Sequence, residues 1–341
     1  TKEWLYKKFA ARPVIADANY KAMQTGYFFG ETTETFQRRY SVRPASLPPG
    51  TYRKVTGNEA LALGLVTAAQ KMGKPLFYGA YPITPATDIL HFLAPLRHFD
   101  VRTFQAEDEI AAMGSTIGAA FGGALAVTGT SGPGIALKSE AINLGVMLEL
   151  PMVIVNVQRG GPSTGQPTKT EQSDLLQGMF GRNGESPIVV LAPASPSDCF
   201  DIAIEACRLA VRAMTPVFVL SEGFLANSAE PWLLPDVDEI PEINVYHPED
   251  RNGDNGHEPF MPYSRDPVTL ARPWAIPGTK GLEHRLGGLS KAPETGNVSY
   301  ESEHNEYMTL ARAEKIERLA EVIPPVDVYG PKRGELLIVS W

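Results

Sequence analysis

The chain has 341 residues, 43% of them hydrophobic, and a formal net charge of −8 from 39 acidic and 31 basic residues. This length leaves room for two domains. The basic residues are scattered, so the charge pattern excludes a surface for nucleic acid or for an anionic membrane. No apolar run approaches the roughly 20 residues that cross a bilayer, which predicts a soluble protein.

The N-terminal stretch, residues 1–50, carries helical signals followed by the proline-rich run SVRPASLPPG, and it shows no residues of obvious chemistry. The chain starts at Thr1 without a methionine. It stops at Trp341 just after an apolar run, Gly334–Ser340, that we expect to be the first strand of another domain. We therefore expect this sequence to be a fragment of a longer polypeptide.

The central part of the chain alternates apolar runs with helical patterns. A helix is predicted after Thr56, ending at Gly73. Six short apolar runs then follow, each bounded by turn signals: Leu76–Tyr78, Val101–Gln105, Ala124–Gly129, Met152–Val157, Ile188–Ala192 and Val217–Leu220. Alternating strands and helices predict an α/β domain with a largely parallel sheet covered by helices on both faces. This domain is expected to close near Pro235.

Tyr81–Asp88, with the sequence YPITPATD, follows the first of these strands. Thr84 is predicted as the N-cap of a helix with Pro85 as its first residue, which would place free backbone N–H groups at the end of the strand. Such a helix terminus suits an anion. A plainer interpretation is that Thr84 only caps the helix.

A second helix is predicted from about Glu107, and it opens with three acids in a row. One of its faces carries glycines at four-residue spacing: Gly114, Gly118 and Gly122. A glycine inside a helix costs about 1 kcal/mol relative to alanine, so we expect a backbone or a ligand to pack closely against this face. The opposite face has the apolar stripe of a core-facing helix: Ile110, Met113, Ile117 and Phe121.

Arg159 ends an apolar strand and precedes Gly160-Gly161-Pro162. It is therefore expected at the carboxyl edge of the sheet, where α/β folds bind ligands. Arginine is suited to clamp a carboxylate with two parallel hydrogen bonds. The alternative is a surface arginine on a loop.

The two cysteines, Cys199 and Cys207, are predicted to be lone buried thiols, because their spacing suits neither a disulfide framework nor a metal-ligand set. Together with the lack of a signal peptide, they favour a cytoplasmic location. The six histidines show no ligand spacing, so no metal site is predicted in this chain. Gly129–Gly134 followed by Lys138 resembles a P-loop, but the lysine comes four residues too late.

Beyond Pro235 the sequence has little periodicity until Tyr300, and a segment of this kind is often functional or packs on a partner. We expect it to wrap over a neighbour. Tyr300–Ile323 returns to a helical pattern, with apolar positions at Tyr307, Leu310, Ile316 and Leu319.

Several ordered motifs together resemble the α subunit of 2-oxoacid:ferredoxin oxidoreductases, nearest to the 2-oxoglutarate branch. They are YPITP, the helix beginning AEDE, TGTSGPG, and the run VIVNVQRGGPSTGQPTKTEQSDL. The resemblance runs from about Gly57 to Glu222. It implies a thiamine-diphosphate-binding fold, with the pyrimidine-binding domain at 51–235. It also implies the end of a fused γ-type domain and a linker (1–50), an extended segment with a helix (236–325), and the start of a transketolase-C-terminal-like domain (326–341).

The resemblance also implies roles for individual residues. Family spacing to the glycines selects Glu109, rather than Glu107, as the carboxyl group that binds N1′ of the cofactor's aminopyrimidine ring and drives its imino form. The alternative is that Glu107, Asp108 and Glu109 only offset the helix dipole. Other implied cofactor contacts are Pro82, Ile83 and Gly132. Implied substrate contacts are Thr84, Arg159, Thr164 and Lys169, the last two for the distal carboxylate.

The activity implied is conversion of 2-oxoglutarate and CoA to succinyl-CoA and CO2, with ferredoxin as electron carrier, or the reverse carboxylation of a reductive citric acid cycle. The chain has no diphosphate-binding half and no cluster cysteines. NGDNG (Asn252–Gly256) echoes the metal–diphosphate motif, but no strand precedes it and a turn is predicted. The resemblance therefore implies a β subunit that carries Mg2+ and a [4Fe-4S] cluster, with thiamine diphosphate at the interface of an α2β2 assembly.

Three alternatives remain open from the sequence. The first is the same chemistry on pyruvate or a branched-chain 2-oxoacid. The second is a non-catalytic α/β assembly module, and the third is a thiamine-dependent lyase or decarboxylase without ferredoxin.

Overall fold

The computed structural model describes residues 1–34, 40–249, 259–326 and 328–340. The chain divides into two compact units, Thr1–Pro49 and Gly50–Trp341. The first contains helices α1 (Lys2–Lys8) and α2 (Pro13–Thr32), as the helical signals predicted. The hydroxyl of Tyr6 on α1 donates to Asp17 on α2 at 2.6 Å, and the rings of Tyr6 and Tyr20 lie 6.1 Å apart.

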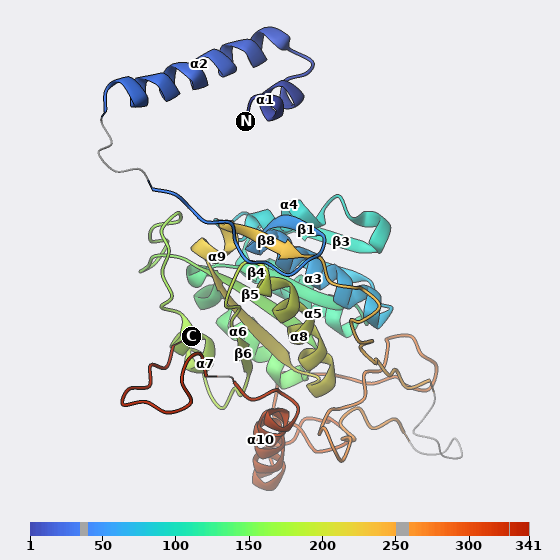
Figure 1. Ribbon diagram of the computed structural model, residues 1–341. Helices are drawn as coiled ribbons and strands as arrows, with labels where there is room; N and C mark the ends of the chain where they lie inside the picture. Colours follow the sequence, from blue (N-terminus) through green and yellow to red (C-terminus); the bar gives the residue numbers. More distant parts are fainter. Residues whose placement is uncertain (35–39, 250–258, 327, 341) are drawn as a thin grey trace. The chain divides into compact units, whose positions relative to one another are not determined.

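The second unit is built on a six-stranded sheet with the order β3-β2-β4-β5-β7-β6, in which every neighbouring pair is parallel (Figure 1). Its strands match the six predicted runs: β2 (Leu76–Ala80), β3 (Val101–Gln105), β4 (Leu125–Thr130), β5 (Met152–Gln158), β6 (Val189–Leu191) and β7 (Pro216–Glu222). The central strands β4, β5 and β7 are buried along their whole length. The predicted parallel α/β sheet is confirmed.

Helices cover both faces of the sheet because side chains alternate along each strand. Val153, Val155 and Val157 of β5 belong to the core shared with α3 (Gly57–Met72), α4 (Thr87–Leu93) and α8 (Asp198–Ala213). Met152 and Ile154 belong to the opposite core, shared with α5 (Glu109–Phe121), α6 (Gly132–Leu148) and α7 (Leu175–Phe180). Both cysteines lie on α8 as free, buried thiols, as predicted.

A second, two-stranded antiparallel sheet pairs β1 (Tyr52–Thr56) with β8 (Ala229–Leu233), which follows the short helix α9 (Gly223–Asn227). Neither strand was predicted, because YRKVT and AEPWL have no continuous apolar run. The cap predicted at the end of β1 is present: Thr56 Oγ1 accepts from the backbone N–H of Glu59, and Gly73 ends α3 in the left-handed conformation.

Helix α5 differs from its prediction on both faces. Met113 and Ile117 are buried, but Ile110 is 56% exposed, because the first turn of the helix lies outside the hydrophobic core. A Cβ added at Gly114 or Gly118 would meet nothing within 4 Å. The close neighbour expected for this glycine face is therefore not supplied by the described part of the chain.

The segment expected to wrap over a neighbour lies, in its described parts (235–249 and 259–300), on the chain's own sheet unit. The Trp274 indole N–H donates to the carbonyl of Ala120 at 2.9 Å, and Lys291 Nζ donates to the carbonyl of Met147 at 2.8 Å. Glycines and prolines prevent regular structure here, so single side chains rather than a ladder attach it.

Helix α10 (Ser302–Glu317) and the 3-10 turn Arg318–Glu321 follow, as the helical pattern predicted (Figure 1). The predicted apolar stripe is wrong in part: Tyr307 and Leu310 are exposed, and the buried face includes Arg312 and Lys315. The strand predicted at Gly334–Ser340 is absent, because the segment pairs with no described strand and its apolar side chains are exposed. Among the described residues, no helix combines the length and apolarity that a membrane crossing requires.

Candidate functional site

The carboxyl edge of the sheet gathers the residues singled out from the sequence. Parallel pairing sets Thr130 at the end of β4 beside Asn156 of β5, and Gln158 at the end of β5 beside Glu222 of β7. The chain leaving β2 begins at Tyr81, and the chain leaving β5 begins at Arg159. Loops at this edge are where open parallel sheets bind ligands.

The three acids that precede α5 separate into three different environments. Glu107 is exposed, and Asp108 is the N-cap, whose carboxylate accepts from the backbone N–H of Ala111 at 2.8 Å. Glu109 is the first residue of the helix and is half-buried, and a Cβ added at Gly134 would lie 3.3 Å from its Cγ. Only Glu109 therefore turns towards the start of α6, so the plain helix-dipole role falls mainly to Asp108.

Beside Glu109, the start of α6 approaches the chain leaving β2 very closely. The Tyr81 and Thr130 hydroxyls are hydrogen-bonded at 2.8 Å, and a Cβ at Gly134 would lie about 2 Å from each of them, at 2.1 and 2.0 Å. Only glycine fits at this position. Burial is the main reason that the pKa of Tyr81 is raised well above its ordinary value, and the charge of Glu109 adds to it.

Lys138, one turn further along α6, is fully buried. Its Nζ donates to Thr128 Oγ1 at 2.7 Å and lies 5.2 Å from the centroid of the Tyr81 ring. Burial lowers the pKa of Lys138 to about 7, and the charge of Glu109 opposes that shift. Lys138 was considered in the sequence only as part of a P-loop. The missed signal is a lysine on the inward stripe of a helix, between Gly134 and Ala141.

Thr84 is not a helix cap, contrary to prediction. Helix α4 begins only at Thr87, whose Oγ1 accepts from the backbone N–H of Ile83 at 2.8 Å, and residues 84–86 form a turn before it. The N-cap position of α4 is Ala86, which makes no side-chain cap hydrogen bond. Thr84 and Pro82 are exposed and Ile83 is half-buried, so all three remain accessible at the sheet edge.

Arg159 is 6% exposed, and its guanidinium joins two loops. Nη1 donates to the carbonyl of Thr84 at 2.6 Å, and Nη2 donates to the carbonyl of Thr164 at 2.8 Å. The surface-loop alternative is therefore excluded. Its Nε is buried without a partner, and each terminal nitrogen keeps a second N–H, so the side chain retains donors for a ligand.

The loop after β5 closes on itself through its backbone. The N–H of Gly160 donates to Lys169 O at 2.9 Å, and Gly160 O accepts from Gln166 N at 2.7 Å. A Cβ at Gly165 would collide with Gly160 O, so a glycine is required there. Thr164 and Lys169 are exposed, and their side chains form no hydrogen bond within the described chain. The structure thus brings Thr164 to Arg159 but not to Glu109.

Polar residues at the end of β5 were missed in the sequence. Asn156 donates to Asp174 Oδ2 at 2.9 Å, and the backbone N–H of Asp174 donates to Gln158 Oε1 at 2.9 Å. Gly132 adjoins this group, since a Cβ there would lie 2.7 Å from Asp174 Oδ2. Two amides within the apolar run MVIVNVQ were the available signal.

Several buried polar atoms at this edge have no partner among the described residues: Asn58 Oδ1, Ser131 Oγ, Asn156 Oδ1 and Arg159 Nε. Buried polar groups in folded proteins are nearly always hydrogen-bonded. Ser131 begins the SGPG turn, and Asn58 Nδ2 donates to Pro85 O at 3.0 Å, so these atoms surround the same edge as Glu109. The donors and acceptors present fit a polar ring bound there.

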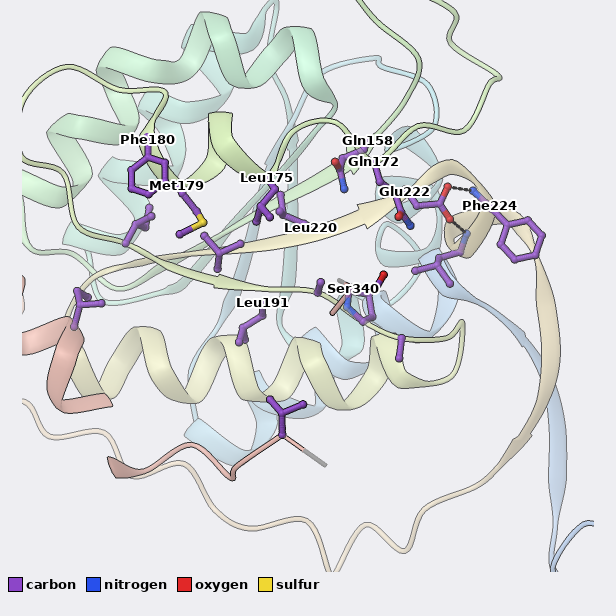
Figure 2. A pocket seen from close by; sticks show the side chains of 18 of the residues that line it. Gln158, Gln172, Leu175, Met179, Phe180, Leu191, Leu220, Glu222, Phe224 and Ser340 are labelled. Atoms are coloured by element: carbon purple, nitrogen blue, oxygen red, sulfur yellow. Dashed lines mark hydrogen bonds between the residues drawn. The ribbon is translucent and has the colours of Figure 1, made fainter. Parts of the chain in front are cut away.

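A separate cavity of about 1040 Å3 lies against β6 and β7, and Figure 2 shows its largely apolar lining, including Leu175, Met179 and Leu220. At one end lie Gln158 and Glu222, whose carboxylate accepts from the backbone N–H groups of Phe224 and Leu225 at 2.7 Å. Neither Glu109 nor Arg159 lines this cavity, so we do not assign the predicted chemistry to it.

The turn predicted at NGDNG (Asn252–Gly256) lies outside the residues that the structure describes.

A parallel α/β sheet with a half-buried acid, a glycine cradle and unpartnered polar atoms at its carboxyl edge defines a cofactor-binding α/β protein. Residues 68–288 match the family described as pyruvate flavodoxin/ferredoxin oxidoreductase, thiamine diphosphate-binding. The chain belongs to this family, and the predicted resemblance is confirmed.

Individual relatives are similar over different lengths. The chain is 54% identical over 342 residues to the 2-oxoglutarate oxidoreductase subunit KorA of Mycobacterium tuberculosis, covering 100% of this chain and 51% of that protein. It is 43% identical over 187 residues to the 2-oxoglutarate synthase subunit KorA of Methanothermobacter marburgensis, covering 54% of this chain and 48% of that protein. The chain thus spans about half the length of these curated relatives.

A solved structure is also similar to this chain over nearly its whole length. The 2-oxoglutarate:ferredoxin oxidoreductase from Magnetococcus marinus, with 2-oxoglutarate, coenzyme A and succinyl-CoA bound, superposes with a TM-score of 0.84 at 33% identity. The match covers 97% of this chain and 56% of that chain.

Proposed function

We propose that this chain is the pyrimidine-binding part of the α subunit of a thiamine-diphosphate-dependent 2-oxoglutarate:ferredoxin oxidoreductase. The observation that carries the proposal is the half-buried Glu109 at the first position of α5, beside Tyr81 and the glycine cradle of α6, in a chain of this family. The 2-oxoglutarate named in several relatives supports the choice of substrate over pyruvate or a branched-chain acid.

Glu109 would hold a proton at N1′ of the aminopyrimidine ring, with Ile83, Pro82 and Gly132 lining its approach. Thiamine diphosphate, when bound, supplies the carbanion chemistry through its thiazolium ring. The half-buried setting of Glu109 keeps bulk water from competing for that proton, and the Gly134 approach positions the carboxyl group. The overall reaction converts 2-oxoglutarate and CoA to succinyl-CoA and CO2, with electrons passed to ferredoxin.

Thr84 and Arg159 would place the substrate. Arg159 is already bonded to the backbone on both sides of the site, so it holds the Thr84 turn in position and offers its remaining N–H groups to the 2-oxoacid carboxylate. Exposed Thr164 and Lys169 are then available for the distal carboxylate, after movement of the loop that carries them.

A β subunit would supply the diphosphate-binding half, Mg2+ and a [4Fe-4S] cluster in an α2β2 assembly in the cytoplasm. Two observations support a partner surface around α5: nothing covers its glycine face at Gly114 and Gly118 among the described residues, and the side chains of Ile110 and Phe104 are exposed. Two buried free thiols support a reducing compartment.

The test is Glu109→Gln in the full-length α subunit assembled with its β subunit. Glutamine keeps the size but cannot hold the transferable proton, so 2-oxoglutarate-dependent reduction of ferredoxin should fall by at least about 100-fold. Size-exclusion elution should not change. The matched control is Glu107→Gln, two residues earlier and exposed, which should keep wild-type activity.

An E109Q rate equal to that of wild type would exclude Glu109 from the reaction and would favour an assembly role for this chain. Substrate choice is tested by comparing 2-oxoglutarate with pyruvate and a branched-chain acid. A site with polar groups for a distal carboxylate should reject acids that lack it. Turnover without any electron acceptor would instead indicate a lyase or decarboxylase.

A further inference from the structure

Lys138 is a buried titratable group that the proposed reaction leaves without a role. It lies on the inward face of α6 with 0% exposure, and its Nζ has one hydrogen-bond partner, Thr128 Oγ1 at 2.7 Å. Within the described chain it forms no ion pair. A buried ammonium with so few partners is costly, so a purely structural function would be better served by an apolar side chain.

The surroundings of Lys138 connect it to the candidate site. Its Nζ lies 5.2 Å from the Tyr81 ring centroid, in a cation–π arrangement. The hydroxyl of the same ring is bonded to Thr130, and Gly134 brings that hydroxyl and Glu109 to one point of α6. Tyr81 therefore lies beside the ammonium of Lys138 and, at Gly134, also close to the side chain of Glu109.

The charged and titratable groups around Lys138 come from three elements. Glu109 lies on α5, Tyr81 follows β2, and Arg159 after β5 acts on Tyr81. Glu109 is the acid whose charge acts on Lys138 within the described chain.

We propose that Lys138 is a positioning residue that acts as the counter-charge of Glu109 beside Tyr81 and sets the pH at which the bound aminopyrimidine ring, protonated at N1′ through Glu109, loses a 4′-amino proton to give its imino tautomer. This inference rests on the function proposed above. A cation near Glu109 stabilises the carboxylate and disfavours the positively charged, N1′-protonated ring that Glu109 contacts. Lys138 thereby favours loss of the ring proton at a lower pH.

Burial supports this role, because it lowers the pKa of Lys138 to about 7 while Glu109 raises it. A lysine with this pKa changes charge in the range in which a cytoplasmic enzyme works. The titrations of Lys138 and of the ring are coupled, so the midpoint belongs to the pair and not to either group alone.

The experiment uses the full-length α subunit assembled with its β subunit and loaded with thiamine diphosphate, without substrate. The circular-dichroism band of the imino tautomer is titrated against pH. In Lys138→Met the midpoint should move up by about half a unit to one unit, because the repelling charge is gone. The acidic limb of the kcat profile should move with it, while KM for 2-oxoglutarate should not change.

Three variants separate charge from packing. Lys138→Arg keeps the charge and should keep the wild-type midpoint. Thr128→Val removes the acceptor but leaves the lysine, and should give a smaller shift in the same direction. Lys315→Met deletes another lysine, buried to 1% exposure at the opposite end of α6, and should change stability but not the midpoint.

A K138M midpoint equal to wild type, or an equal shift in K315M, would overturn the inference. If K138R fails to fold, the midpoint of K138M compared with those of T128V and K315M still tests the inference. A wild-type complex that binds thiamine diphosphate but does not oxidise 2-oxoglutarate would refute the proposed substrate alone, since the titration needs no substrate. A wild-type complex that binds no thiamine diphosphate would refute both.

Discussion

The two ends of α6 both bury charge, but they partner it differently. Near its start, Lys138 has a single hydroxyl acceptor and no ion pair in the described chain. Just past its end, the buried Glu149 is fully paired: Arg265 donates to both of its oxygens, at 2.6 and 2.8 Å, and Lys315 donates to one at 2.6 Å.

The surroundings of Glu149 complete this pattern, and we define the Glu149 cluster as Glu149, Arg265, Arg272, Lys291 and Lys315. Arg272 Nε donates to the carbonyls of Leu148 and Glu149 at 3.0 Å, and Lys291 caps the carbonyl of Met147. Cations at a helix C-terminus interact favourably with its dipole. The four cations come from the irregular segment and from α10, so this cluster fastens both to the sheet unit.

The difference indicates what each charge does. A buried charge whose partners are complete fastens one segment to another, and removing a partner leaves the other uncompensated. A buried charge with few partners, next to orphaned polar atoms, is typical of a site where a ligand or a proton completes the set. The predictions below test this contrast, and they run from the largest expected change to the smallest.

Glu149→Gln should have the largest effect on stability. It leaves Lys315 and Arg265 buried without a counter-charge, which should lower the free energy of unfolding by about 3–5 kcal/mol. Glu140→Gln, an exposed position on the same helix, should change it by less than about 0.5 kcal/mol. Thermal unfolding of the assembled protein measures both. Equal melting temperatures for the two variants would break the proposed contrast.

Gly134→Ala tests the crowded end of α6. The new Cβ would lie about 2 Å from the Thr130 and Tyr81 hydroxyls, at 2.0 and 2.1 Å. Displacing this hydrogen-bonded pair should cost about 3 kcal/mol and should also weaken thiamine diphosphate binding. Gly145→Ala is the control on the same helix, since its nearest neighbours are side-chain atoms at 3.2 and 3.3 Å. It should fold and bind the cofactor as wild type does.

The pH dependence of stability should differ between wild type and Lys138→Met. Burial lowers the pKa of Lys138 to about 7 in the folded protein, so between this pH and its unfolded value of 10.5 the unfolded chain binds more protons. Wild-type stability should therefore fall as the pH falls through this window. Below pH 7 the loss is complete. In calorimetric scans, the stability of K138M should not show this pH-dependent loss. An equal loss of stability in wild type and K138M would contradict the prediction.

Gly114→Ala should have the smallest effect. Nothing lies within 4 Å of the new Cβ, so the α subunit alone should gain up to about 1 kcal/mol of stability. If the β subunit packs on this face, the same change should weaken assembly. Gly64→Ala, where the Cβ would lie 2.4 Å from Phe200 O, should destabilise the α subunit itself. A G114A variant that is less stable alone would show that the face is closed within the chain.

Much of the fold could be predicted because strands β2 to β7 are short apolar runs between turn signals, and buried parallel strands require that composition. Arg159 was likewise expected at the carboxyl edge of the sheet because it follows an apolar strand, and in the structure it directly follows β5. The two-stranded sheet of β1 and β8 could not be predicted, because its strands have no continuous apolar run and pair across most of the domain. Ile110 and Tyr307 show the same limit, since helical periodicity does not reveal where a core ends.

By itself, the sequence determined the family and the parallel sheet, and it singled out Glu109 as the candidate acid, because these depend on local composition and on motifs contiguous in the chain. Only the tertiary structure decided that Thr84 is not a helix cap, that Arg159 joins two loops, and that Lys138 is buried behind Glu109 while Glu149 is enclosed by cations. These features depend on contacts between residues far apart in sequence. The desolvation and pairing of a charge are properties of the folded surroundings and not of the residue itself.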